Sequence, residues 1–265
     1  MSGLRVGRIA ALNMYPLYHH LERAADPAMT FVDGLPTALN AAVLEDRLDV
    51  SAMSSIAYAR HAASLRLLPV ACIAAAGAVD SIQVFSRVPL RQVRTVAVTP
   101  HSATSVTLLR VLLGPGVPFV PLEGTPEDAL REVDGVLLIA DEALSALRQE
   151  LAPYHADLGG LWRARTGLPM VFAVWAARED SARRTPDRLE ALAGLLAEAQ
   201  SRYAANPEEV VAAAARRFPF PADEIRAYFC RLRYGFGPAE RAGLARFLEL
   251  ARSAGELQGL PRLAA

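Results

Sequence analysis

The sequence predicts an α/β protein of two lobes joined by two strands, with a helical tail at its C-terminal end. Short apolar runs alternate with helix-like segments over the first two thirds of the chain, a pattern typical of parallel sheets covered by helices on both faces. The last third is helical in pattern, and we expect no strand beyond about Ala177. Two apolar runs, Ser81–Pro89 and Pro169–Ala177, lead into and out of the second strand–helix series, and we interpret them as the strands that link the lobes.

The first strand–helix series occupies the N-terminal part of the chain. Pro16 lies near the first turn of one expected helix, a position that proline favours. The expected strands are 4–12, 29–34 and 49–53, and the expected helices are 16–24, 36–47 and 54–65.

The second series and the tail follow the same logic. Gly167 and Pro169 in the stretch TGLP predict the end of a helix before a strand. In the second series we expect strands at 94–99, 118–123 and 135–141, with helices from Ser102 and over 126–133. The tail helices each carry an apolar stripe and an early proline, and we expect them at 185–205, 221–234 and 238–255.

These boundaries predict a discontinuous first lobe, 1–87 plus 173–265, and a second lobe over 88–172. A cleft would lie between them. The apolar stripes of the tail fit either a cover on the first lobe or a contact between two copies, so we expect a monomer or a homodimer.

Composition excludes several classes of partner. The chain has 265 residues with 28 basic and 28 acidic side chains, so its formal net charge is zero and a general electrostatic grip on nucleic acid or an anionic membrane is not expected. No secretory signal and no long uncharged apolar run is visible. Cys72 and Cys230 are isolated in apolar surroundings, which indicates two buried thiols in a reducing compartment. We therefore expect a cytoplasmic protein.

Familiar cofactor and nucleophile motifs are missing. The sequence contains no GxGxxG, no GxxxxGK[ST] and no GxSxG, and its histidines show no HExxH or other metal spacing, so neither a dinucleotide fold, a P-loop, a nucleophile elbow nor a metal site is indicated. His19 and His20 are adjacent on an expected helix and should face different directions. His101 could act as a base, although a surface histidine beside a helix cap is the simpler interpretation. Trp162 and Trp175 are expected to pack in the core and at the hinge.

The candidate site comes from the residues that follow the strands. Ligands of open α/β sheets bind beyond the carboxyl ends of strands, where helix amino termini present free amides. One helix start carries Ser102, Thr104 and Ser105, although a single cap satisfies one orphan amide. Neutral donors of this kind suit a carboxylate or a phosphate, and Asp141 is the acidic exception. The candidates are Asn13, Ser54, Ser55, Ser81, Ser102, Ala103, Thr104, Ser105 and Asp141.

Six stretches between residue 8 and about 178 carry a resemblance to a known family. They are, in order, RIAALNMYPLYHHL, LPTALNAAVLEDRLDVSAMSSIAYAR, DSIQVFSRVPL, VAVTPHSATSVTLLRVLL, LLIADEAL and DLGGLWRARTGLPMVFAVWAAR. Together they resemble the menaquinone-biosynthesis family of the futalosine route.

The resemblance implies a fold similar to that of type II periplasmic solute-binding proteins. It also implies conversion of chorismate, a dicarboxylate, to 3-[(1-carboxyvinyl)oxy]benzoate with loss of water and without a cofactor. Asn13 would orient the enolpyruvyl carboxylate of the substrate, which takes the proton, or hold the departing hydroxyl. Ser81 and the hydroxyls of 102–105 would bind the carboxylates.

Two alternatives stay open. A sister enzyme of the family, 1,4-dihydroxy-6-naphthoate synthase, carries a catalytic His followed by Glu where this chain has Ala140–Asp141–Glu142, and this difference favours the dehydratase. The chain also departs twice from the usual pattern of the dehydratases, with Ala78 where proline is common in them and Ala140 where glycine is common. The second alternative is a small-anion-binding protein, a class for which a receptor would need an export signal and a regulator a helix-turn-helix.

Overall fold

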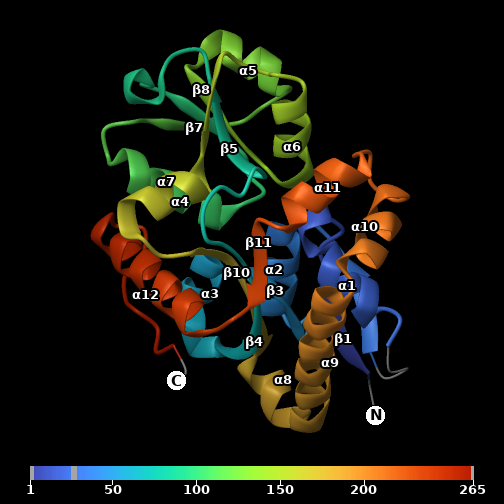
Figure 1. Cartoon of the computed structure of the whole chain (residues 1–265). Coiled ribbons are helices and arrows are strands. Elements are labelled where there is room, and N and C mark those ends of the chain that lie inside the picture. Colours follow the sequence, from blue (N-terminus) through green and yellow to red (C-terminus); the bar gives the residue numbers. More distant parts are fainter. Residues whose placement is uncertain (1–2, 25–28, 264–265) are drawn as a thin grey trace.

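The computed structural model describes residues 3–24 and 29–263 as two sheets with helices packed around each (Figure 1). One sheet collects strands from both ends of the chain, and the other collects strands from its middle.

The first sheet has the strand order β11-β4-β10-β3-β1-β2. Strands β2, β1 and β3 run parallel, whereas β10, β4 and β11 each pair antiparallel with their neighbours. Its strands are β1 (Leu4–Arg8), β2 (Met29–Asp33), β3 (Val50–Ser54), β4 (Leu65–Ala75), β10 (Met170–Arg178) and β11 (Leu232–Gly235).

Helices from both ends of the chain surround this sheet (Figure 1). The N-terminal ones are η1 (Leu12–Met14, a 3-10 turn), α1 (Tyr15–Leu21), α2 (Pro36–Leu44), α3 (Ser55–Arg60) and η2 (Ala62–Ser64). The C-terminal ones are α8 (Glu179–Arg184), α9 (Pro186–Ala205), α10 (Pro207–Ala215), α11 (Ala222–Phe229) and α12 (Pro238–Ser253).

The second sheet has the order β7-β6-β8-β5-β9, with β7, β6 and β8 parallel and β5 antiparallel to both β8 and β9. Its strands are β5 (Ile82–Ser86), β6 (Val96–Val98), β7 (Phe119–Pro121), β8 (Gly135–Ile139) and β9 (Tyr154–Asp157). Its helices are η3 (Leu90–Gln92), α4 (Ala103–Leu113), α5 (Pro126–Glu132), α6 (Ala140–Arg148) and α7 (Leu158–Thr166).

Three predictions about strands are wrong. The sheets are mixed rather than parallel, because β10, β4 and β11 return antiparallel across the first sheet and β5 does so in the second. Strand β11 lies beyond Ala177 and cuts short the expected helix 221–234. Its buried Leu232 and Tyr234 alternate with exposed Arg233 and Gly235, a period of two that the helical pattern around it obscured. Strand β4 was missed because eight of its eleven residues are buried, so it shows no regular alternation.

The expected linking strands lie within sheets. Strand β5 belongs wholly to the second sheet and β10 wholly to the first, so the chain crosses between the sheets through residues 76–81 and 167–169. The lobe division 1–87 plus 173–265 and 88–172 stays a proposal. The carboxylate of Asp157, at the end of β9, ties the first crossing to the first turn of α7. It accepts hydrogen bonds from the amides of Val79 (2.9 Å), Asp80 (2.7 Å) and Gly160 (2.8 Å).

The apolar core is continuous from one sheet to the other. Trp162 and Trp175 are fully buried, as predicted, and Trp162 lies edge-on to Phe247 of α12 with ring centroids 6.1 Å apart. Gly167 ends α7 in the left-handed region (φ 70°), as TGLP predicts. Cys72 is buried, as predicted. Cys230 is exposed where the chain turns after α11, so the prediction that it is buried is wrong.

Within the described ranges, no helix combines the length and the apolar character needed to cross a membrane.

A glycine allows α12 to pack against the start of β10. A Cβ added at Gly243 would collide with the carbonyl oxygen of Pro169, whereas one added at Gly194, on the exposed side of α9, would meet nothing within 4 Å. We expect Gly243→Ala to lower the free energy of unfolding by about 1–3 kcal/mol through overpacking. We expect Gly194→Ala to raise it by about 0.5–1 kcal/mol, because alanine loses less backbone entropy in a helix. Urea unfolding of both variants measures this, and equal effects would contradict the packing.

Candidate active site

Four strand ends form the framework of the site. Strands β1 and β3 are parallel neighbours in the first sheet, and β6 and β8 are parallel neighbours in the second. The carboxyl ends of parallel neighbours lie at the same edge of a sheet, so the segments that follow them lie together. Those segments are η1, α3, α4 and α6, and they contain all the candidate residues except Ser54 at the end of β3, Ser81 before β5, and Ser102 before α4.

Two hydrogen bonds hold these strand ends face to face. The amide of Leu12, after β1, donates to Oδ1 of Asp141 in α6 at 3.0 Å. The amide of Ile56, in the first turn of α3, donates to Oγ1 of Thr104 in α4 at 3.2 Å. Thr104 is buried, so this second hydroxyl at the start of α4 serves a helix of the opposite lobe. The β1 end therefore faces the β8 end, and the β3 end faces the β6 end.

The other hydroxyls at the start of α4 form a local cap. Oγ of Ser102 accepts from the amide of Ser105 at 3.2 Å and lies 2.8 Å from Oγ of Ser105. Ala103 is the first residue of the helix and is half-buried, and its small side chain leaves room beside the cap. Ser102 and Ala103 are the more accessible part of this helix start, whereas Thr104 and Ser105 are 1% exposed.

The two serines at the end of β3 have different surroundings. Oγ of Ser55 donates to the carbonyl of Val171 in β10 at 2.7 Å, so its hydroxyl ties α3 to the first sheet. Oγ of Ser54 accepts from Nδ2 of Asn40 at 3.4 Å, and α3 has no side-chain cap. The amino terminus of α3 is thus satisfied from across the lobes by Thr104 rather than by its own serines.

Asn13 and Ser81 are both reached by tyrosines of the C-terminal tail. The hydroxyl of Tyr228 in α11 donates to Oγ of Ser81 at 2.8 Å, and the hydroxyl of Tyr234 in β11 donates to the carbonyl of Asn13 at 3.0 Å. The side-chain Oδ1 of Asn13 is buried and has no hydrogen-bond partner within the described part of the chain. An unpartnered buried oxygen is costly, and a ligand donor would relieve that cost.

The two tail tyrosines were not among the site residues predicted from the sequence. Tyr228 and Tyr234 lie in segments with an apolar pattern and no motif, so they were indistinguishable from core residues. The usable signal was chemical, because a buried tyrosine hydroxyl needs a hydrogen-bond partner. Burial raises the pKa of Tyr228 and of Tyr234 well above the usual value, so both phenols stay protonated and remain donors.

Carboxyl groups at the β8 end and before Ser81 are partly desolvated. Burial raises the pKa of Asp141, and the hydrogen bond from the amide of Leu12 lowers it to a smaller extent. Burial also raises the pKa of Glu142 and of Asp80. Asp80 forms an ion pair with Arg231 at 2.5 Å, which opposes the effect of burial.

Two of the four non-glycine residues with positive φ in the described part of the chain lie at Ser81, and the other two, Asp46 and Glu150, lie elsewhere. Asp80 (φ 59°) and Ala140 (φ 53°) both lie in the left-handed region although neither is a glycine. The amide of Ala140 donates to the carbonyl of Ser81, the residue after Asp80, at 2.7 Å. Strained residues of this kind cluster at functional sites, where the surrounding structure holds them.

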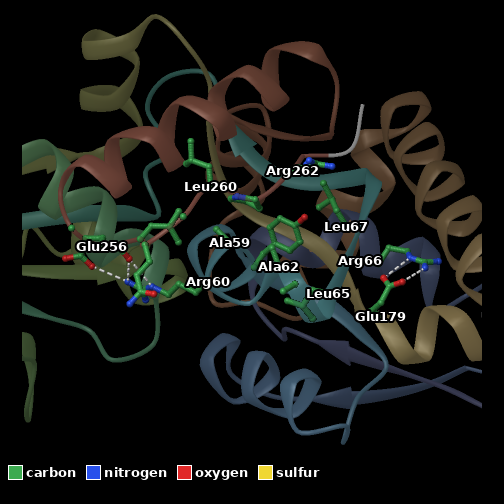
Figure 2. Close-up of a pocket in the computed structure, with 17 residues that line it drawn as sticks. Ala59, Arg60, Ala62, Leu65, Arg66, Leu67, Glu179, Glu256, Leu260 and Arg262 are labelled. Carbon is green, nitrogen blue, oxygen red and sulfur yellow. Dashed lines mark hydrogen bonds and ion pairs between the residues drawn. The ribbon is translucent and has the colours of Figure 1, made fainter.

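Of two cavities, the smaller lies beside the candidate residues and the larger lies away from them. A cavity of about 340 Å³ lies between α6 and α11 and is lined in part by Leu12, Asp80 and Tyr228, each next to a candidate residue. A larger one of about 890 Å³ lies between α3, β4 and the C-terminal segment 255–262, and none of the candidate residues lines it (Figure 2). Its Arg60 and Arg66 are each paired with a glutamate, as Figure 2 shows.

Comparison with known proteins decides the family. A family model described as "Menaquinone biosynthesis" matches residues 4–253, nearly the whole chain. The chain belongs to this family. It is 35% identical over 255 residues to the chorismate dehydratase of Thermus thermophilus, a match that covers 89% of this chain and 91% of that protein. It is also 29% identical over 172 residues to the chorismate dehydratase of Campylobacter jejuni, over 63% of this chain and 64% of the relative.

Solved structures confirm the predicted fold. A protein of Archaeoglobus fulgidus superposes with a TM-score of 0.76 at 18% identity, covering 96% of this chain and 98% of that one. The periplasmic aliphatic sulphonate binding protein of Escherichia coli does so with a TM-score of 0.65 at 17% identity, covering 98% and 90%. The family member therefore has the fold of a two-lobed periplasmic binding protein, as the sequence resemblance implied.

Replacing Ala140 by glycine tests the strain at the site. Glycine adopts a positive φ without steric cost, so Ala140→Gly should raise the free energy of unfolding, by up to about 1 kcal/mol after the loss of unfolded-state entropy is subtracted. Ala143 is buried in the interior of the same helix, and Ala143→Gly should lower the free energy of unfolding by about 1 kcal/mol or more. Denaturant titration compares the two, and destabilisation by both variants would argue against strain at Ala140.

Proposed function

We propose that this chain dehydrates chorismate to 3-[(1-carboxyvinyl)oxy]benzoate. The observation that carries the proposal is the 35% identity to a chorismate dehydratase over 89% of the chain. The partner would be this small-molecule dicarboxylate, with no nucleic acid and no membrane involved, and we expect the enzyme to be cytoplasmic.

The geometry of the four strand ends supports this function. Chorismate carries two carboxylates, and helix amino termini with neutral hydroxyls bind carboxylates without a cationic side chain. The helix start at Ser102–Ser105 and the hydroxyl of Ser81 would each hold one of them. Because Oγ of Ser81 accepts a hydrogen bond from the hydroxyl of Tyr228, its own hydrogen points elsewhere and is free to donate to the substrate.

The reaction breaks the C3–H and C4–O bonds and releases the two fragments as water. The electron pair of the C3–H bond completes the aromatic ring as hydroxide leaves, so product stability provides the driving force. The protein needs to position the ring and stabilise the charge that develops. In our proposal the enolpyruvyl carboxylate of the substrate takes the C3 proton.

Asn13 and Asp141 would act on the two ends of this elimination. Asn13 both donates and accepts, and its unpartnered Oδ1 supports a contact with the substrate. Asp141 lies at the β8 end, where burial raises the pKa of its carboxyl group, and it would hydrogen-bond the departing hydroxyl. Where the sister enzyme carries a His before a Glu, this chain has Asp141 before Glu142, so the dehydratase remains the better candidate.

Incubation with chorismate tests the function directly. Purified protein, without added metal or nucleotide, should yield an aromatic product lighter by one water, detected by chromatography and mass spectrometry. Asn13→Ala and Asn13→Asp should lower kcat by about a hundredfold or more, as loss of a transition-state donor does. Asn206→Ala, an exposed asparagine on the tail, is the matched control and should keep full activity. Full activity in both Asn13 variants would exclude the assigned role. Binding of chorismate without turnover would favour the small-anion-binding alternative.

Tyr228 provides a second test, of substrate positioning. Tyr228→Phe removes the hydrogen bond to Ser81 and frees its hydroxyl to rotate, so KM for chorismate should rise and kcat/KM should fall about tenfold, the equivalent of about 1.4 kcal/mol. Tyr154→Phe, on the exposed end of β9, should leave both constants unchanged. Unaltered constants in Tyr228→Phe, in a variant that melts like the wild type, would show that the tail does not orient Ser81.

A further inference from the structure

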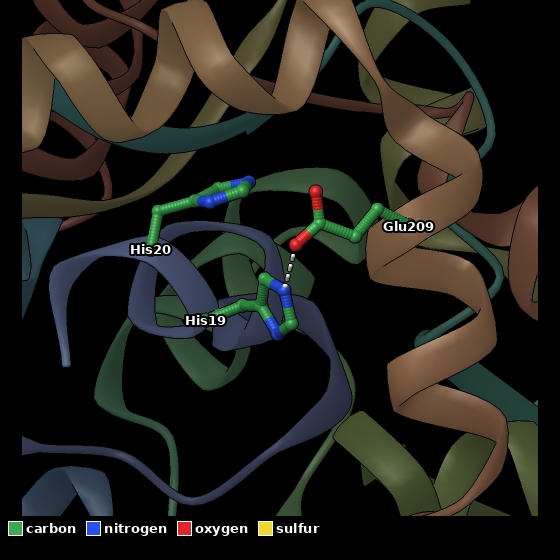
Figure 3. Close-up of side chains that lie close together, drawn as sticks. All are labelled: His19, His20 and Glu209. Carbon is green, nitrogen blue, oxygen red and sulfur yellow. Dashed lines mark hydrogen bonds and ion pairs between the residues drawn. The ribbon is translucent and has the colours of Figure 1, made fainter. Parts of the chain in front are cut away.

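We propose that His19, His20 and Glu209 form a binding site for a divalent transition metal ion of the Zn²⁺ type, between α1 and α10 (Figure 3). The site is separate from the four strand ends and from the proposed dehydration. It would join the N-terminal part of the first lobe to the C-terminal tail.

The spacing of the ligand atoms fits such an ion. Nε2 of His19 lies 3.1 Å from Oε1 of Glu209, and one ligand atom of each of the three residues lies within 4.8 Å of the others. Two ligands of a tetrahedral zinc ion are about 3.3 Å apart, given Zn–N and Zn–O distances near 2.0–2.1 Å. A small rotation of the His20 ring would complete the set, and imidazole with carboxylate is a common donor set for Zn²⁺.

His20 offers a buried ring nitrogen that could bind the ion. It is 7% exposed, and its Nε2 has no hydrogen-bond partner among residues 3–24 and 29–263. The two imidazoles lie edge to face with centroids 4.9 Å apart, so the expectation that they face apart on the helix is wrong. The reason is that α9 and α10 both pack against α1 and cover both rings.

His19 already has the support that a metal ligand needs. Its Nδ1 lies 3.3 Å from the hydroxyl of Tyr15, one turn earlier in α1, while its Nε2 faces Glu209. Ligating histidines normally use their second nitrogen in a hydrogen bond to an oxygen, which fixes the ring orientation. The arrangement leaves Nε2 as the ligand atom.

Arg23 now supplies the positive charge at this cluster. Its Nη1 lies 2.8 Å from Nε2 of His19 and 2.6 Å from Oε1 of Glu209, the same two atoms that would bind the ion. The Arg23 side chain is 60% exposed, so it can move into solvent when a metal ion takes its place. The guanidinium and the metal therefore compete, and removal of Arg23 should strengthen metal binding. A simple ion-pair cluster with no metal function predicts no such gain.

Binding of Zn²⁺ to the EDTA-treated full chain, without a polyhistidine tag, tests the proposal by isothermal titration calorimetry. We expect one ion per chain and a rise in the unfolding temperature, because an ion that binds the folded state stabilises it. Glu209→Gln and His20→Gln should weaken binding at least tenfold, and Arg23→Gln should tighten it severalfold. Glu209 is exposed, so its variant should fold even if the His20 variant does not. His61→Gln, an exposed histidine elsewhere, is the control and should bind as the wild type does.

Co²⁺ gives a second readout, because a tetrahedral site with imidazole ligands produces visible absorption bands that Glu209→Gln should abolish. Absence of saturable binding to the wild type would overturn the proposal. Binding that Glu209→Gln, His20→Gln and Arg23→Gln all leave unchanged would overturn it as well, since the ion would then lie elsewhere.

Discussion

The pairing of the two lobes depends on backbone amides of one lobe that find their partners on side chains of the other. Leu12 donates to Asp141 and Ile56 to Thr104, so the ends of β1 and β3 are fixed against the ends of β8 and β6. Each such bond contributes about 1 kcal/mol net, but an orphaned amide at a buried helix start would cost more. These two hydrogen bonds therefore favour the arrangement in which the strand ends face each other, and a ligand with acceptor oxygens could replace the same partners.

The C-terminal tail completes the site that the lobes begin. Tyr228 and Tyr234 bring phenol donors from α11 and β11 to Ser81 and to the backbone of Asn13. Strand β11 can do this because it joins the first sheet beside β4, which carries the tail back towards the strand ends. The same tail contacts α1 through α9 and α10, so the His19–His20–Glu209 cluster and the candidate active site share one structural support.

Much of the fold could be predicted because local patterns carried it. Periodicity placed most helices, and a glycine with a proline fixed the end of α7. Strands β4 and β11 were not predicted. Burial on both faces removes the alternation of β4, and the helical pattern around β11 obscures its period of two. In the candidate site, strand ends followed by polar residues predicted segments that the structure brings together. The partners of Thr104 and Ser81 could not be predicted, because they lie 48 and 147 residues away and depend on how the sheets face each other.

The central claim is that chorismate binds where the ends of β1, β3, β6 and β8 meet. A crystal structure of the Asn13→Ala variant with chorismate tests it most directly, because the substrate should persist when turnover is slow. We expect density for chorismate between the lobes, with one carboxylate at the amino terminus of α4 and the ring beside position 13. Chorismate in the cavity lined by Arg60 and Arg66 instead, with nothing between the lobes, would contradict it.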